Sequence, residues 1–207
     1  MTEPTPPRTK KSVALSGVVA GNTALCTVGV NGNDLHYRGY DILDLADKAS
    51  FEETAYLLIY GELPNCAQLK KYREKLISLR GIPALIKSVL ELIPAAAHPM
   101  DVLRTYCSLL GTLYPEREDH NTAGARDIAD KLIASFPSAL LYWHHYTQNG
   151  TRITTQSEEE TVGGYFLELL HQKRPPASWV KAMAISLNLY AEHEFNASTF
   201  TARVIAG

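Results

Sequence analysis

Apolar residues beyond position 41 recur mostly three or four positions apart, the spacing that places them on one face of an α-helix. Ser50 with Glu53 has the spacing of a capping box, and Asn65 can cap the next helix. The pattern predicts helices over about 51–60, 66–79, 83 onward, 99–113, 122–146, 158–171, 177–193, and from about 196. We therefore expect a mainly α protein.

Two of these predicted helices contain residues that affect where the helix begins or whether it continues. Pro137 lies inside the 122–146 segment and should kink or break it, because proline lacks the N–H of a helical hydrogen bond. Ser157 with Glu160 resembles a second capping box, which predicts that the helix ending near His171 starts there.

The N-terminal region has a different pattern. Residues 1–11 are rich in proline and basic residues, which predicts a disordered tail. Between Val13 and Tyr40, β-forming residues such as Thr23 and Leu25 flank the turn signal 31–33, and a small β-hairpin is expected. This gives a tail over 1–11, a hairpin region over 12–40 and a helical region over 41–207.

Composition narrows the function classes. Apolar residues make up 45% of the chain, charged residues 20%, and the net charge is −2, which is typical of a globular protein without a nucleic-acid footprint. No apolar run approaches the roughly 20 residues of a membrane span. The three cysteines, Cys26, Cys66 and Cys107, are odd in number and lack metal-site spacing, so we expect buried free thiols in a reducing cytoplasm.

The segment Leu189–Arg203, L-Y-A-E-H-E-F-N-A-S-T-F-T-A-R, concentrates the candidate chemistry. Its His193 lies between two glutamates, with Tyr190 and Asn196 three residues away on either side. At helical spacing these three would form one polar stripe, continuing a buried face made of Trp179, Met183 and Leu187. The plainer alternative is a histidine satisfied by neighbouring carboxylates at a helix end.

Several motifs, taken together, resemble the citrate synthase family. They are the E-H-E step followed by N-A-S-T, L-S-G-V-V-A-G-N-T-A-L-C-T-V-G at 15–29, Y-R-G-Y-D-I at 37–42, S-F-E-E-T-A-Y-L-L at 50–58, G-E-L-P at 61–64 and H-P-M-D-V-L-R-T at 98–105. They occur in the family's order. The resemblance implies the family's large helical domain, an acyl-CoA and oxaloacetate as substrates, no cofactor, and a homodimer packed through helices such as 99–113 and 123–146.

The resemblance also implies that this chain is the N-terminal part of an enzyme. The family's carboxylate base and enol-stabilising histidine, the latter in a G-P-x-H-G-G-A-N-E segment, are expected after Gly207, because no such motif occurs in 1–207. We therefore expect no catalytic residue here and no activity from residues 1–207 alone.

Within the family, the resemblance assigns His193 to oxaloacetate binding. Asn196 is a weaker candidate for the same wall of the site, or a helix cap. Tyr190 replaces a histidine found in many bacterial citrate synthases, and in this the segment is similar to the 2-methylcitrate synthases, which use propionyl-CoA; Tyr190 is then expected at the acyl pocket. The alternative for Tyr190 is an ordinary core residue.

Three functions remain open. The first is condensation of propionyl-CoA with oxaloacetate and water to 2-methylcitrate and CoA, with some use of acetyl-CoA. The second is an ordinary citrate synthase, and the third is a non-catalytic helical interaction module.

Other polar residues receive structural interpretations. His98 is expected to make a local hydrogen bond, Arg38 to hold the fold, and Arg203 to face solvent or form an ion pair. His144 and His145 are adjacent and so do not face one metal ion on a helix. The basic run Lys70, Lys71, Arg73 and Lys75 is expected to form a solvated helix face.

Overall fold

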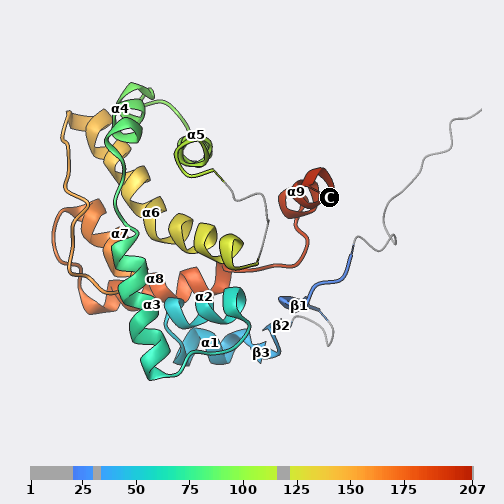
Figure 1. The fold of residues 1–207 in the computed structure, drawn as a ribbon. Helices are drawn as coiled ribbons and strands as arrows, with labels where there is room; N and C mark the ends of the chain where they lie inside the picture. Colours follow the sequence, from blue (N-terminus) through green and yellow to red (C-terminus); the bar gives the residue numbers. More distant parts are fainter. Residues whose placement is uncertain (1–20, 30–33, 116–121, 207) are drawn as a thin grey trace, which may run out of the picture. The chain divides into compact units, whose positions relative to one another are not determined.

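The computed structural model describes residues 21–29, 34–115 and 122–206, and within these the chain is mainly helical with one small sheet (Figure 1). It divides into two compact units. The larger comprises residues 25–194, and the smaller comprises the described residues up to 24 together with those from 195. The expected tail at 1–11 lies outside the described residues. No described helix is both long and apolar enough to cross a membrane.

The expected hairpin is present and has a third strand that the sequence pattern did not predict. Strands β1 (Cys26–Val28), β2 (Leu35–Tyr37) and β3 (Tyr40–Asp41) form an antiparallel sheet in that order. Arg38 and Gly39 connect β2 to β3 with φ angles of 47° and 88°, as a two-residue type I′ turn requires. Thr23 and Leu25 precede the strands, and the turn at 31–33 lies outside the described residues.

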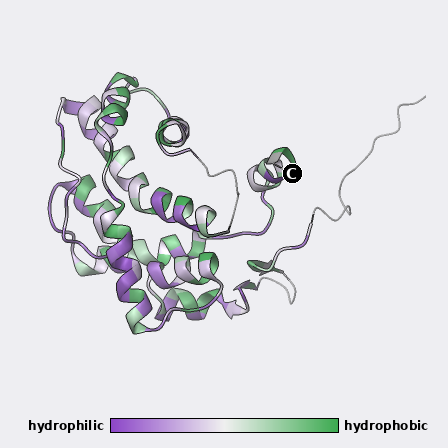
Figure 2. Ribbon diagram, in the orientation of Figure 1, coloured by the Kyte–Doolittle hydropathy of each residue, from purple (hydrophilic) through white to green (hydrophobic). Residues whose placement is uncertain are grey.

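Three helices follow, α1 (Ile42–Lys48), α2 (Phe51–Tyr60) and α3 (Cys66–Ser78). Both predicted N-termini are confirmed, because the Ser50–Glu53 and Asn65–Gln68 pairs each form a complete capping box. Arg38 fixes the sheet to α2 by donating to the Leu58 carbonyl at 2.9 Å, which agrees with a structural role. Figure 2 shows α3 as largely hydrophilic.

The main core lies where α6 (Thr122–Asn149) packs against α4 (Ala84–Leu92), α5 (Pro99–Leu113) and α7 (Val162–His171). Its largest fully buried side chains include Ile86, Leu90, Tyr106 and Tyr165. His98 caps α5, with Nδ1 accepting a hydrogen bond from the Met100 N–H, as expected. His145 Nε2 lies 2.9 Å from the Leu169 carbonyl, so it links α6 to α7.

A break at Pro137 and a helix start at Ser157 are not observed. Helix α6 continues through Pro137, which is itself buried, so the proline does not break the helix. Helix α7 begins after Thr161, whose hydroxyl accepts from the Gly164 N–H. The Ser157 hydroxyl instead donates to the Glu168 carboxylate at 2.6 Å and is not a cap.

The basic run on α3 is not uniformly solvated. Lys75 reaches the fully buried Asp130 of α6 at 2.6 Å and the exposed Asp127 at 2.7 Å. Asp130 also accepts from the hydroxyls of Tyr60 and Tyr72, so its charge is fully hydrogen-bonded. The expectation fails for Lys75 because its partners lie more than 50 residues later in the chain.

All three cysteines are free, but only Cys26 is buried. Cys107 is partly buried, and Cys66, at the start of α3, is exposed. The expectation of three buried thiols is therefore wrong for Cys66.

Candidate functional site

The candidate segment begins at the end of α8 (Ala177–Tyr190), and the expected polar stripe does not form. The helix ends before His193, and Glu194 has a φ of 50°, outside the helical range. Asn196 lies beyond this break, in the smaller unit. A single helical face therefore cannot hold Tyr190, His193 and Asn196 together.

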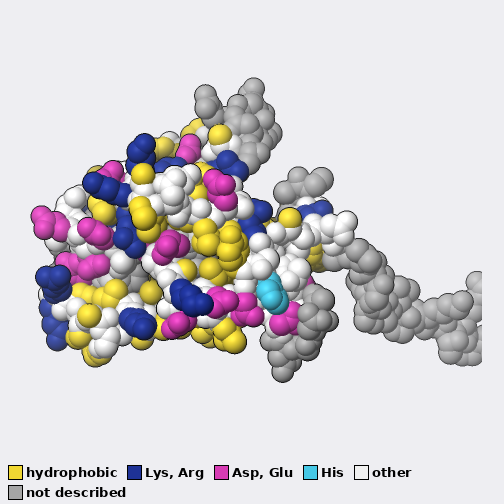
Figure 3. Space-filling model, turned by 90° about the horizontal axis from the view of Figure 1, so that it is seen from below, with side chains coloured by type: hydrophobic (Ala, Val, Ile, Leu, Met, Phe, Trp, Pro, Cys, Tyr) yellow, Lys and Arg dark blue, Asp and Glu magenta, His cyan; other side chains and the backbone are white. Residues whose placement is uncertain are grey.

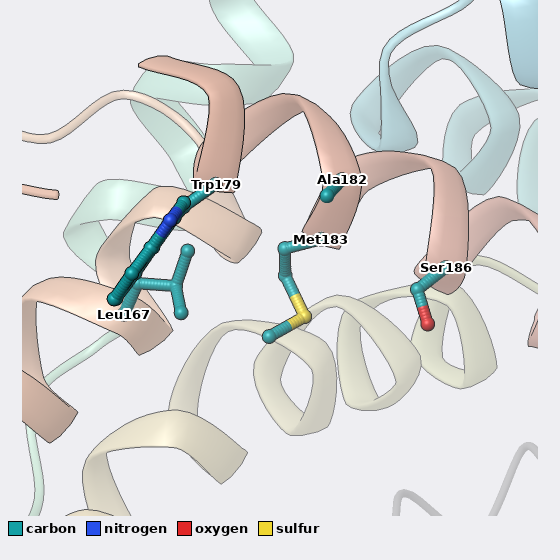
Figure 4. Close-up of a pocket in the computed structure, with 5 residues that line it drawn as sticks. All are labelled: Leu167, Trp179, Ala182, Met183 and Ser186. Atoms are coloured by element: carbon teal, nitrogen blue, oxygen red, sulfur yellow. The ribbon is translucent and has the colours of Figure 1, made fainter. Parts of the chain in front are cut away.

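The side of α8 that is buried also differs from the expectation. Asn188 is its only fully buried residue, and Leu187 packs partly against α2 and α3. Trp179 is 48% exposed. With Leu167 of α7 it lines an open groove of about 320 Å³, together with Ala182, Met183 and Ser186. Figure 4 shows Met183 and Ser186 pointing to the same side of α8, with the Trp179 ring beside Leu167.

His193 is exposed on the short loop 191–194. Its imidazole makes no hydrogen bond with the described residues of the larger unit, whereas its backbone N–H donates to its neighbour Glu192 at 3.1 Å. Glu194 accepts at 3.0 Å from the backbone N–H of Val28 in β1. Both neighbouring carboxylates thus bind backbone groups, and the alternative of a histidine satisfied by them is not observed.

The loop that carries His193 is held by the small sheet. Tyr37 is fully buried in β2, and its hydroxyl donates to the Asn188 carbonyl at 2.9 Å and accepts from the Glu192 N–H at 3.3 Å. The Asn188 amide donates to the carbonyls of Leu45 and Ala49 at 3.3 and 3.0 Å. These contacts place the end of α8 firmly against α1 and the sheet, and sequence reasoning had not singled out Tyr37 or Asn188.

Burial also changes the pKa of two side chains that contact the loop, Cys26 and Tyr37. Desolvation raises the pKa of the Cys26 thiol, and a hydrogen bond from the Glu194 backbone opposes this rise. Burial likewise raises the pKa of the Tyr37 hydroxyl, so it remains a neutral hydrogen-bond donor at physiological pH. Both groups therefore support the loop and are not ionised nucleophiles.

Tyr190 is 87% exposed. The alternative that it is an ordinary core residue is therefore wrong for this chain. Counting along the helix, Trp179, Met183 and Tyr190 are separated by four and seven residues, so Tyr190 continues the open face of α8. That face ends beside the His193 loop.

In the smaller unit, Asn196 caps helix α9 (Ala197–Ala206). Its side-chain oxygen accepts from the Thr199 N–H at 2.8 Å, so the cap interpretation is confirmed. Arg203 of the same helix lies over the Phe195 ring, 5.0 Å from its centroid.

Other candidate chemistry is not supported among the described residues. They contain no group of three or more histidine, cysteine or acidic side chains that could hold a metal ion. Figure 3 shows basic and acidic side chains interspersed on the visible face, without a single-sign region of the kind that binds nucleic acid.

Comparisons with known proteins agree with this organisation. Residues 14–207 match the family model described as citrate synthase, C-terminal domain. A 2-methylcitrate synthase of Shewanella oneidensis is 56% identical over 93% of this chain and 50% of its own length. A citrate synthase of Synechocystis is 33% identical over 93% of the chain and 48% of its own length.

Solved structures show the same fold. Citrate synthase from Thermotoga maritima matches 93% of this chain and 49% of its own with a TM-score of 0.79 and 31% identity. A ternary complex of carboxymethyl coenzyme A and oxaloacetate with citrate synthase from Thermoplasma acidophilum covers 95% of this chain and 52% of its own. Its TM-score is 0.84 at 24% identity, which shows the fold alone.

The chain belongs to the citrate synthase family, and its helical architecture with a small sheet is the one expected. It spans about half the length of the curated relatives that it matches.

Proposed function

We propose that the full protein containing this chain is a 2-methylcitrate synthase, which condenses propionyl-CoA with oxaloacetate and water to give 2-methylcitrate and CoA. The observation that supports this most strongly is the 56% identity to a 2-methylcitrate synthase over nearly the whole chain. Two further relatives with that name, from Corynebacterium glutamicum and Mycobacterium tuberculosis, are 40% and 38% identical.

His193 is proposed to bind oxaloacetate. It is exposed on a fixed loop, and its ring nitrogens bind none of the described residues of the larger unit. An imidazole N–H is therefore available to donate to a carboxylate or to the ketone oxygen. Tyr190 is proposed to shape the acyl pocket, because it extends the open apolar face of α8 toward that loop. Asn196 caps α9, and its proposed contribution is to orient the segment following His193.

The condensation needs a base to remove a proton beside the thioester, a donor to the resulting enol oxygen, and donors that polarise the ketone. Residues 1–207 contain no match to the G-P-x-H-G-G-A-N-E motif of the enol donor, and of these three roles we assign only the last to this chain, through His193. We therefore propose that residues 1–207 alone are inactive and that no resident cofactor takes part.

Ordinary citrate synthase is the second candidate, and the relatives of that name at 33% and 39% identity favour it. Measuring CoA release by the full-length protein with propionyl-CoA and acetyl-CoA separates the two. A higher kcat/KM for propionyl-CoA supports the first function, and a higher value for acetyl-CoA supports the second. Absence of CoA release with either substrate would favour a non-catalytic interaction module.

We also propose that the full protein is a homodimer. We propose that α5 and α6 form the contact, because Met100 of α5 and Ile128 of α6 are exposed apolar side chains, although Trp143 of α6 is buried in the core of the larger unit. A cytoplasmic location is proposed as well, supported by the exposed free thiol of Cys66, which suits a reducing compartment.

A further inference from the structure

The backbone on both sides of His193 is anchored to the small sheet. On one side, the Tyr37 hydroxyl accepts from the Glu192 N–H at 3.3 Å and lies 3.2 Å from the carbonyl of the same residue. On the other, the Glu194 carboxylate accepts from the Val28 N–H at 3.0 Å. Strands β1 and β2 are paired with each other, so the two anchors belong to one rigid element.

The imidazole makes no hydrogen bond with the part of the larger unit that the structure describes. Its position therefore depends on the backbone of residues 192–194, and that backbone depends on the sheet. Tyr37 is the deeper of the two anchors. It is fully buried, and its hydroxyl has the Asn188, Leu189 and Glu192 carbonyls within 3.4 Å.

A buried hydroxyl that gathers several backbone groups of one loop restricts that loop far more than a surface contact does, because removing it leaves those groups unpaired away from water. The carbonyls and the N–H around Tyr37 would have to move or recruit water to recover their partners. Either change displaces the residues that immediately precede His193.

We infer that Tyr37 is a positioning residue for His193, setting the orientation of the imidazole through the end of α8 and the Glu192 backbone. This inference rests on the proposed binding of oxaloacetate by His193. It assigns to the N-terminal sheet a part in ketoacid binding, although no residue of the sheet is proposed to touch the substrate.

The test compares Tyr37→Phe with Tyr165→Phe in the full-length protein. Tyr165 is a matched control, because it is also fully buried and its hydroxyl donates to a backbone carbonyl, that of Thr155, at 2.8 Å. Tyr37→Phe should raise the KM for oxaloacetate about tenfold, the effect of one lost buried hydrogen bond, and leave the KM for acyl-CoA within about twofold. Tyr165→Phe should leave both KM values within about twofold.

Hydrogen exchange gives a readout independent of activity. The amides of residues 192–194 should exchange about tenfold faster in Tyr37→Phe and at the native rate in Tyr165→Phe. Combining Tyr37→Phe with His193→Ala should weaken ketoacid binding no further than His193→Ala alone, since Tyr37 acts through His193.

The second anchor keeps the inference testable if Tyr37→Phe does not fold. Glu194→Ala removes the acceptor for the Val28 N–H and should raise the oxaloacetate KM selectively, whereas Glu194→Gln retains an acceptor oxygen and should restore it. A normal oxaloacetate KM in Tyr37→Phe or Glu194→Ala, beside an impaired His193→Ala, overturns the positioning role alone. An equal rise in Tyr165→Phe overturns it too. Normal ketoacid kinetics in His193→Ala overturns instead the proposed function of His193, and the positioning role with it.

Discussion

Glu52 of α2 accepts a hydrogen bond of 2.8 Å from the backbone N–H of Val162, the first residue of α7, 110 residues later in the chain. Glu52 is 1% exposed, and Arg73 lies 3.9 Å from its other oxygen. A carboxylate at a helix N-terminus satisfies an unpaired N–H and interacts favourably with the helix dipole. This contact therefore acts with the Thr161 cap to set where α7 begins.

Replacing Glu52 by alanine should lower the free energy of unfolding by about 2–4 kcal/mol, because the Val162 N–H loses its partner and a neighbouring arginine loses its counter-charge. Glu52→Gln keeps an acceptor oxygen and should cost much less. Urea denaturation of the two variants measures the difference. Equal losses in both would contradict the cap.

Comparing Glu52→Gln with the native protein also tests how the stability of the fold depends on pH. Burial raises the pKa of Glu52 in the folded state, so the contribution of this carboxyl to stability is complete below its unfolded pKa, about 4.3, and decreases as the pH rises through the folded value. Glutamine does not titrate. The stability of Glu52→Gln relative to the native protein should therefore increase with pH above about 4. A difference that is independent of pH would count against the raised pKa.

Asp130 and Asp127 offer a matched comparison, since both pair with Lys75 at nearly equal distances, 2.6 and 2.7 Å. Asp130 is fully buried, whereas the Asp127 side chain is 72% exposed. Asp130→Ala should destabilise the fold by about 3–5 kcal/mol, because it leaves the Lys75 charge without its buried partner. Asp127→Ala should cost about 0–1 kcal/mol. Thermal or urea denaturation distinguishes them, and similar losses would show that burial is not the deciding factor.

In the full-length protein, His193→Ala should lower kcat/KM for oxaloacetate by an amount equivalent to about 2–3 kcal/mol of transition-state free energy, the size of a lost charge-assisted hydrogen bond. Steady-state kinetics at saturating acyl-CoA measures this, with circular dichroism as the control for folding. An unchanged value would return His193 to a structural role.

Tyr190→His should alter the ratio of kcat/KM for propionyl-CoA to that for acetyl-CoA by no more than about a hundredfold, the range that one methylene group allows. The KM for oxaloacetate should stay near its native value. Tyr190→His should thus change the acyl-CoA preference, whereas His193→Ala should change the kinetics with oxaloacetate. A constant acyl ratio would remove Tyr190 from the acyl pocket.

The features predicted correctly from the sequence are those set by nearby residues. The capping boxes at Ser50 and Asn65 each join residues three positions apart, and the chain can form them without reference to the rest of the fold. Ser157 has the same local signature, yet α7 starts at Val162, because Glu52 and Thr161 satisfy its first N–H groups there.

In the candidate site, too, the sequence predicts the local features and misses those that depend on distant residues. The sequence singles out the segment around His193 as a candidate site because its residue types and order resemble a family. Its conformation was not readable, because α8 ends through contacts with Tyr37 and Val28, which lie 151 to 166 residues away in the sequence. Helical periodicity alone predicted that the helix continues to His193 and that Trp179 is buried. Both predictions are wrong.

The separation between Tyr37 and Asn188 also has a consequence during protein synthesis. Asn188 is added to the growing chain 151 residues after Tyr37. At about 5–20 residues per second, roughly 8–30 seconds pass between them. Throughout that interval the N-terminal strands lack the helix end against which they pack. A nascent chain arrested before α8 therefore exposes a tyrosine-bearing strand to chaperones and to other chains, and β2 is made early but completed late.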